Sequence, residues 1–192
     1  MTPPILETPR HQCFIYQGAA SAHLPEVAQT LIRRLKANRR CLYLNSPAMV
    51  AGMRSQLAAA GLDPRAQSER GALILSSDQG HLVDGKFDVE RMLRLLRETL
   101  QKALADGYEG LWAAGDMTWE FGGEANWDKL LEYELRLDEF LKENPAMSGV
   151  CLYHRDTVPA HAIETAMITH PALFISAFFS KPNPSYCQNP AR

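Results

Sequence analysis

The chain has 192 residues, of which 46% are hydrophobic, and a formal net charge of -2. That is enough for one domain with a full core and argues against wholesale disorder. The chain has no excess of Lys and Arg of the kind that is typical of nucleic-acid-binding proteins. No apolar run approaches the roughly 20 residues that a membrane span needs. The first ten residues do not read as a signal peptide. We therefore predict a cytoplasmic protein that contacts neither nucleic acid nor membrane directly.

Apolar runs that predict strands alternate with amphipathic segments that predict helices. The predicted strands cover residues 12–16, 41–44, 72–75, 110–115, 147–153 and 173–177. The predicted helices cover residues 24–37, 47–60, 88–106, 126–144 and 156–169, with residues 62–71 and 76–87 as connections. Ser46 and Asp88 are expected to cap the second and third helices. This alternation predicts an α/β fold of three layers, in which helices cover both faces of a mainly parallel sheet.

The domain boundaries follow from proline content. Residues 1–10 are expected to form a flexible N-terminal arm, residues 11–180 a single α/β domain, and residues 181–192 an extended, proline-rich tail. The apolar stretch FISAFF at 174–179 could form an exposed sheet edge, which is often covered by another chain, so a homodimer is a possible assembly.

The stretch GLWAAGDMTWEF at 110–121 is the centre of the predicted sheet. Its first half is continuously apolar, as in a strand buried on both faces, and it ends at Asp116 with Trp119 three residues later. Ligands of open α/β sheets bind at the carboxyl ends of the strands. There we expect Tyr16 and Trp119 to supply apolar surface, and Asp116 and His154 to orient a polar group of a small-molecule ligand.

The segment after the first strand argues against nucleotide hydrolysis. A phosphate-binding P-loop would read G-x-x-x-x-G-K-[ST], whereas this chain reads QGAASAHLPEV at 17–27, with one glycine and no lysine. A G-x-S-x-G nucleophile elbow is also absent from the sequence. We predict no catalytic residues, no enzymatic activity and no cofactor, and we keep a residual nucleotide-binding protein as an alternative.

The four cysteines form no CxxC pair. Cys13, Cys41 and Cys151 lie in apolar strands, where a buried reduced thiol acts as a small hydrophobic side chain. A zinc site made of Cys13, Cys151, His11 and His154 would match no standard spacing, so we predict no metal site. His11 precedes the first strand and therefore belongs to the sheet edge opposite the predicted ligand site, unless the N-terminal arm folds back.

The motifs form a series in chain order: HQCFIY at 11–16, RRCLYL at 39–44, DGKFDVERML at 84–93, ALADGYEGLWAAGDMTW at 103–119, LLEYELRLDEFL at 130–141, VCLYHRDTVP at 150–159 and NPSY at 183–186. The series resembles the MEDS domain, the methanogen/methylotroph DcmR-type sensory domain, over residues 9–187. The resemblance implies a degenerate RecA/KaiC-like fold without a functional P-loop. It also implies a sensory role in signal transduction or transcriptional regulation, with recognition of a small hydrocarbon-derived or methylated compound.

The same resemblance implies a set of site residues. His11 and Tyr16 match the family's H-x-x-x-x-Y pattern, and Asp116 and Trp119 match its G-[DEN]-x-x-W pattern. Tyr133 and Glu134 match its Y-E pair, and Cys151 matches the cysteine of its fifth strand. We expect Tyr133 and Glu134 to contribute to ligand binding, and His11 and Cys151 to have a structural or ligand role. Family members are often joined to a histidine kinase or a helix-turn-helix regulator, which implies such a partner. The alternative function is a protein–protein interaction module that has lost ligand binding.

Overall fold

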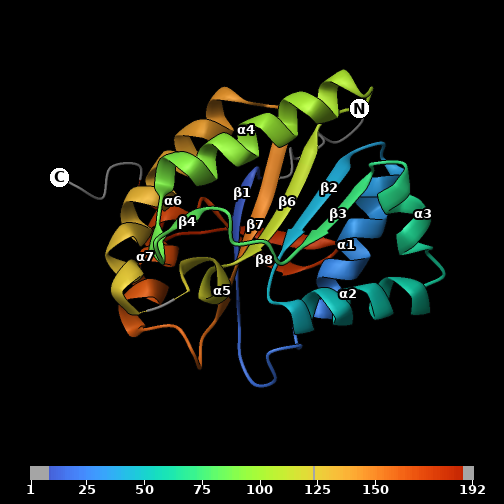
Figure 1. Cartoon of the computed structure of the whole chain (residues 1–192). Coiled ribbons are helices and arrows are strands. Elements are labelled where there is room, and N and C mark those ends of the chain that lie inside the picture. Colours follow the sequence, from blue (N-terminus) through green and yellow to red (C-terminus); the bar gives the residue numbers. More distant parts are fainter. Residues whose placement is uncertain (1–8, 123, 188–192) are drawn as a thin grey trace, which may run out of the picture.

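The structure is a computed structural model that describes residues 9–122 and 124–187. Of the predicted N-terminal arm, residues 1–8 lie outside the described residues, as does the end of the predicted tail, residues 188–192. The elements of the described chain alternate between strand and helix, as the apolar pattern predicts (Figure 1).

The strands and helices have the following bounds. The strands are β1 (His11–Tyr16), β2 (Arg40–Leu44), β3 (Leu73–Ser76), β4 (Leu82–Val83), β5 (Lys86–Phe87), β6 (Leu111–Asp116), β7 (Met147–His154), β8 (Ala172–Ser176) and β9 (Phe179–Pro182). The helices are α1 (Leu24–Lys36), α2 (Pro47–Ala59), α3 (Pro64–Glu69), α4 (Val89–Ala105), α5 (Met117–Phe121), the 3-10 helix η1 (Glu124–Lys129), α6 (Leu130–Glu143) and α7 (Ala160–Thr169).

The main sheet has seven strands in the order β3-β2-β6-β7-β1-β8-β9. All neighbours are parallel except β8 and β9, which are antiparallel. The central strands β2 and β7 are buried along their whole length. Parallel strands of this kind need helices on both faces, since neither face can be exposed to water without a cost.

Two apolar cores lie on the two faces of the sheet. Side chains of α4, α6 and α7 pack against one face, and side chains of α1 and α2 pack against the other. Figure 1 shows these helix groups as separate layers on either side of the strands. The fold is thus a three-layer α/β architecture with a mainly parallel sheet, as predicted.

The predicted helix caps are confirmed. The hydroxyl group of Ser46 accepts a hydrogen bond from the backbone N–H of Met49 at the start of α2. Asp88 accepts one from the N–H of Arg91 at the start of α4. Each cap satisfies one of the backbone donors that the first turn of a helix leaves without a partner.

Short elements were missed in the segments predicted to be connections. The 62–71 segment contains α3, and the 76–87 segment contains the β4–β5 hairpin. A further helix, α5, begins directly after Asp116. Elements of two to six residues carry too few positions for a periodic pattern, so sequence periodicity does not detect them.

The C-terminal strands extend the sheet beyond the predicted sixth strand. Lys181 and Pro182 belong to β9, and the side chain of Asn183 donates hydrogen bonds to the backbone oxygens of Met167 and His170. The beginning of the predicted tail therefore packs on the domain, and β9 covers the outer edge of β8.

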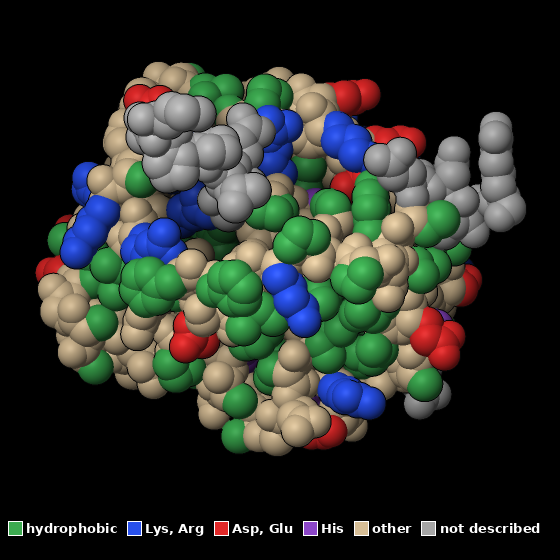
Figure 2. All heavy atoms as spheres, turned by 180° about the vertical axis from the view of Figure 1, so that it is seen from behind, with side chains coloured by type: hydrophobic (Ala, Val, Ile, Leu, Met, Phe, Trp, Pro, Cys, Tyr) green, Lys and Arg blue, Asp and Glu red, His purple; other side chains and the backbone are tan. Residues whose placement is uncertain are grey.

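The face opposite that of Figure 1 carries many hydrophobic side chains (Figure 2). In the β8–β9 hairpin the side chains of Phe178 and Phe179 are 73% and 57% exposed.

Among the described residues, no helix has both the length and the apolarity that crossing a membrane requires.

Candidate functional site

Three of the predicted ligand residues gather at the carboxyl ends of β1, β6 and β7. Asp116 ends β6, and its Oδ2 accepts a hydrogen bond of 3.1 Å from the hydroxyl of Tyr16 at the end of β1. Its Oδ1 accepts a hydrogen bond from the backbone N–H of Trp119 and so caps α5. The ring of His154 stacks on that of Tyr16, with centroids 5.0 Å apart. We call Tyr16, Asp116 and His154 the rim cluster.

Hydrogen bonds tie the rim cluster to the loop after β1. Nε2 of His154 lies 2.8 Å from the carbonyl oxygen of Gly18, and the carboxylate of Asp156 accepts a hydrogen bond from the Gly18 N–H. Gly18 has a φ of 86°, which favours glycine. The loop after β1 is thus attached to side chains at and just after the end of β7.

Beside the rim cluster lies His23, which the sequence did not single out. Its Nδ1 lies 2.9 Å from the Ala20 carbonyl oxygen and its Nε2 lies 2.7 Å from the hydroxyl of Tyr43. Burial lowers the pKa of His23 to about 4. The neutral ring then donates from Nδ1 and accepts from Tyr43 at Nε2.

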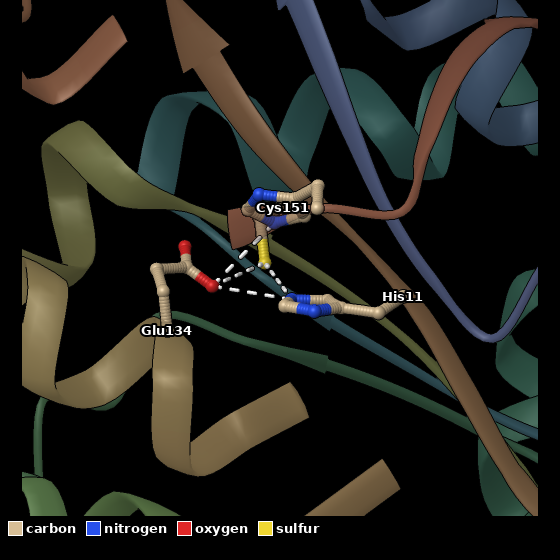
Figure 3. A group of neighbouring side chains, drawn as sticks. His11, Glu134 and Cys151 are labelled. Carbon is tan, nitrogen blue, oxygen red and sulfur yellow. Dashed lines mark hydrogen bonds and ion pairs between the residues drawn. The ribbon is translucent and has the colours of Figure 1, made fainter. Parts of the chain in front are cut away.

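A second group of polar side chains lies inside the domain, toward the other end of the strands. It consists of His11 at the start of β1, Glu134 on α6, Cys151 within β7 and His170 just before β8, and we call it the interior cluster. All four are buried, and their potential ligand atoms lie within 4.8 Å of one another. Figure 3 shows His11, Glu134 and Cys151 converging from separate elements.

The distances within the interior cluster are short. Oε2 of Glu134 lies 3.2 Å from Nε2 of His11 and 3.5 Å from Nε2 of His170. The Cys151 sulfur lies 3.7 Å from the same Oε2 and 3.8 Å from Nε2 of His11. The rings of His11 and His170 have centroids 4.0 Å apart.

A shell of further contacts orients the interior cluster. Nδ1 of His11 lies 3.2 Å from Oδ1 of Asp138, and the hydroxyl of Tyr153 donates to Oε1 of Glu134. Nδ1 of His170 lies 2.9 Å from the carbonyl oxygen of Ala166. In His11, Glu134 and His170, one nitrogen or oxygen makes this outer contact, and the other nitrogen or oxygen of the same side chain points into the cluster.

The protonation states follow from these contacts. Burial alone would lower the pKa of His11, but its hydrogen bonds to Asp138 and Glu134 raise that pKa above its usual value. Burial would raise the pKa of Glu134, but the nearby histidines lower it, so this carboxyl is ionised. Burial also raises the pKa of the Cys151 thiol well above its usual value, and the charge of Glu134 adds to this effect.

A cavity of about 30 Å³ adjoins the interior cluster between the sheet and helices α4 and α6. His11, Cys151, Tyr133 and Glu120 contribute to its wall. The rest of the wall is largely apolar and includes Leu44, Met92, Leu96, Met117, Leu137, Leu141 and Met147. A single water needs roughly 10–15 Å³, so the cavity has room for a very small molecule.

Glu120 is the one carboxyl group among the described residues of this wall. Its side chain is 2% exposed, and its Oε2 makes no hydrogen bond to any described residue. Burial raises its pKa well above the usual value, and the charges of Glu134 and Asp116 raise it further. Burial thus favours the neutral form of the carboxyl group, which can both donate and accept a hydrogen bond.

The structure thus distributes the sequence-predicted residues over two places. Tyr16, Asp116 and His154 meet at the rim, with Trp119 half-buried one turn beyond Asp116. The other four lie on the α4/α6 face of the sheet: His11, Cys151 and Glu134 in the interior cluster, and Tyr133 in the cavity wall. Along β1, His11 and Tyr16 are five residues or about 16 Å apart, whereas Cys151 and His154 are three residues or about 10 Å apart on β7.

Two residues of these sites were missed by the sequence analysis. His170 and His11 precede or begin neighbouring parallel strands, so their shared position at the amino ends was a usable signal. Glu120 had no such signal, because its position depends on α5, which was not predicted.

His154 does not join the interior cluster, although the sequence analysis considered it as a zinc ligand with His11, Cys13 and Cys151. It pairs in register with Tyr16 at the far end of β1, whereas His11 pairs with Gly149. The histidine that joins His11 and Cys151 is His170.

Solved structures resemble the fold at low sequence identity. The KaiC-like protein PH0186 from the archaeon Pyrococcus horikoshii OT3 matches with a TM-score of 0.59 and 12% identity, covering 86% of this chain and 70% of that one. The uncharacterized protein PH0321 from Pyrococcus horikoshii, solved in complex with an unknown peptide, matches with a TM-score of 0.64 and 10% identity, covering 86% and 77% of the two chains. These similarities support a RecA-like fold.

Comparison with curated proteins gives no significant match. The family model of the MEDS domain, described as the methanogen/methylotroph DcmR sensory domain, matches residues 10–171. That span contains all residues of the rim and interior clusters and ends directly before β8. The chain therefore belongs to the MEDS family of sensory domains.

Proposed function

We propose that this MEDS domain is a non-catalytic sensor that binds a small hydrocarbon-derived or methylated compound in the cavity beside the interior cluster. The observation that carries the proposal is the composition of the cavity wall: largely apolar side chains surround one buried carboxyl group whose Oε2 has no hydrogen-bond partner among the described residues. An apolar body with one polar group would match both parts of such a wall.

The size of the cavity points to a ligand of one or a few heavy atoms. Its volume of about 30 Å³ exceeds what one water needs but is far below that of a nucleotide site. Met92, Met117 and Met147 line the cavity, and the unbranched methionine side chain adapts readily to differently shaped ligands. A somewhat larger molecule could be accepted by rearranging these side chains.

Contacts of α5 connect Glu120 in the cavity wall to the segment before the β4–β5 hairpin. Glu120 lies on α5, and its backbone oxygen is 2.8 Å from Nε2 of His81. The side chain of Gln79 donates to the backbone oxygen of Trp119, so the segment before the β4–β5 hairpin is attached to α5 at two points. A ligand that binds one position of α5 more tightly than another would shift this segment as well.

Output would then pass to a protein partner. The family resemblance implies a histidine kinase or a helix-turn-helix regulator as that partner. We propose that residues 77–87 and α5 change their conformation when the ligand binds. The competing proposals are an interaction module without a ligand and a residual nucleotide binder.

A thermal-shift screen of the full chain separates these proposals. The compounds are small alcohols, methylamines and halogenated methanes, with nucleotides plus Mg²⁺ as a separate arm. Sensing predicts stabilisation by one of the small compounds. Stabilisation only by nucleotide with Mg²⁺ would favour the nucleotide binder. No stabilisation by any class, together with binding of a regulator, would favour the interaction module.

Two phenylalanine substitutions on α4 test the position of the site. Leu96 lines the cavity, whereas Leu100, one turn further along the same helix, is equally buried and does not line it. Leu96→Phe should fill the cavity and abolish the shift given by the active compound, and Leu100→Phe should keep it. If Leu96→Phe retains the full shift in a folded protein, the ligand binds elsewhere.

A further inference from the structure

The interior cluster has the composition and spacing of a metal site. It offers two imidazole nitrogens, one cysteine sulfur and one carboxylate oxygen, all within 4.8 Å of one another. With metal–nitrogen bonds of about 2.0–2.1 Å and a metal–sulfur bond of about 2.3 Å, ligand atoms of a tetrahedral zinc site lie roughly 3.3–3.7 Å apart. The distances between cluster atoms run from 3.2 to 3.8 Å along the four edges described above.

The tautomer of His170 supports the same interpretation. The side chain is 0% exposed, and Nδ1 lies 2.9 Å from the Ala166 carbonyl oxygen, a group that can only accept a hydrogen bond. Nδ1 therefore carries the proton, and Nε2 presents a lone pair to the cluster. That Nε2 has no hydrogen-bond partner among the described residues. A buried nitrogen lone pair of this kind is costly unless something occupies it.

The outer contacts match those of metal-binding histidines and carboxylates. Ligating histidines usually donate their second N–H to a carboxylate or a backbone carbonyl, as His11 does toward Asp138 and His170 toward Ala166. The second oxygen of Glu134 is held by the hydroxyl of Tyr153. Three of the four side chains are thus oriented by a partner outside the cluster.

Charge balance is consistent with a divalent cation. A bound metal would hold Cys151 as a thiolate, and this sulfur and the Glu134 carboxylate would then carry two negative charges, which one divalent ion neutralises. Imidazole, thiolate and carboxylate together are typical ligands of zinc. We propose that the interior cluster binds one divalent metal ion of the zinc class, with His11, His170, Cys151 and Glu134 as its ligands.

This proposal does not depend on the sensor proposal above. The alternative for the same residues is a metal-free network, in which a protonated His11 bridges the carboxylates of Glu134 and Asp138. The two states differ at the sulfur, because a metal holds Cys151 as a thiolate, whereas the network keeps it as a thiol that donates to Glu134.

The test uses the full chain, freed of metal with a chelator and titrated with Co²⁺, which substitutes for zinc and reports its ligands by absorption. We expect saturation at one equivalent, a thiolate-to-cobalt charge-transfer band, visible bands of a tetrahedral site, and displacement by Zn²⁺. Zinc should also raise the melting temperature of the metal-free protein. A wild-type protein that binds neither ion at stoichiometric amounts would overturn the proposal.

Cysteine variants identify the sulfur ligand. Cys13 is the register partner of Cys151 on the neighbouring strand and is as deeply buried, but it lies outside the interior cluster. Cys151→Ser should lose the charge-transfer band and weaken metal binding by at least about 100-fold, since it removes a ligand rather than an outer contact. Cys13→Ser should keep both.

A charge-transfer band that survives in Cys151→Ser would assign the sulfur to another residue and contradict the site. His170→Gln gives an independent variant, in case Cys151→Ser does not fold. It should weaken cobalt binding without removing the charge-transfer band at saturation. Circular dichroism of each metal-free variant monitors the fold, and unchanged cobalt affinity in a folded His170→Gln protein would contradict the assignment of this ligand.

Discussion

The carboxyl group of Glu120 occupies the space that a side chain at Gly115 would fill. A Cβ atom placed on Gly115 would lie 1.8 Å from Oε1 of Glu120. Gly115 is the penultimate residue of β6, and α5 begins two residues later, so the chain turns back and brings the acid over the strand. The glycine thus allows a carboxyl group to reach the cavity wall.

Substituting this glycine should displace the acid. We expect Gly115→Ala to lower the free energy of unfolding by about 1–3 kcal/mol, because the added methyl group and the Glu120 carboxyl cannot occupy the same space. It should also reduce the thermal shift given by the cavity ligand. Urea denaturation and the thermal-shift assay measure the two effects.

A double-mutant cycle provides the control. In a Glu120→Ala background, Gly115→Ala should be clearly less destabilising than in the wild type, since the overlapping carboxyl is gone. Equal costs in both backgrounds would show that the strand, rather than Glu120, resists the substitution.

The rim cluster should control the position of α5. Asp116→Ala removes the N-cap of α5 and the hydrogen bond from Tyr16, so we expect a loss of about 1–2 kcal/mol in unfolding free energy and a weaker ligand response. Tyr16→Phe removes only one hydrogen bond and should cost about 1 kcal/mol. Chemical denaturation of both variants measures these losses.

Trp119→Ala tests the original prediction that the rim itself contacts the ligand. If the rim is the binding site, both Asp116→Ala and Trp119→Ala abolish the ligand-induced thermal shift in a folded protein. If the cavity is the site, Leu96→Phe abolishes it and Trp119→Ala only reduces it. A full response in all three variants would exclude both places.

Stability should fall at mildly acidic pH because of His23. Its folded pKa of about 4 lies below its ordinary value of 6.5, so the unfolded state binds more protons between these two values. The stability contributed by the neutral ring is fully present above pH 6.5 and is lost as the pH falls toward 4. The loss from this one residue can reach about 3 kcal/mol.

His23→Gln isolates this contribution, because the amide does not titrate and can still accept a hydrogen bond from Tyr43. The unfolding free energy of the variant, measured by urea titration at intervals from pH 7.5 to about 4, should decline less steeply than that of the wild type. Parallel pH profiles of the two proteins would contradict the assignment to His23.

The outer contact of His11 should tune metal affinity. Asp138 accepts from Nδ1 of His11, and we expect Asp138→Asn to weaken cobalt and zinc binding by roughly 10–100-fold without removing the charge-transfer band. Competition with a chromogenic chelator measures the affinity.

Lys142→Gln is a matched control, since Lys142 pairs with the other oxygen of Asp138 but leaves the contact to His11 in place. It should change metal affinity far less than Asp138→Asn does. Equal effects of the two variants would mean that the whole ion-pair network, rather than the orientation of His11, sets the affinity.

The order of strands and long helices could be predicted from the sequence because it depends on local patterns. The apolar run before Asp116 and the caps at Ser46 and Asp88 are readable within a few residues of the chain. The seven motifs also sufficed to identify the MEDS family, which the family model confirms over residues 10–171. Cys151 and Glu134 were singled out by these motifs, without any indication that they meet.

Only the tertiary structure decided which of these residues share a site. His11 and Glu134 are 123 positions apart and come together because β1 lies between β7 and β8, with α6 packed over them. His170 joins them through the pairing of β1 with β8, and Glu120 reaches the cavity through the five-residue helix α5. A local sequence pattern indicates which face of a strand or helix is buried. The proximity of two distant side chains depends instead on strand order and on short turns, which have no periodic sequence pattern.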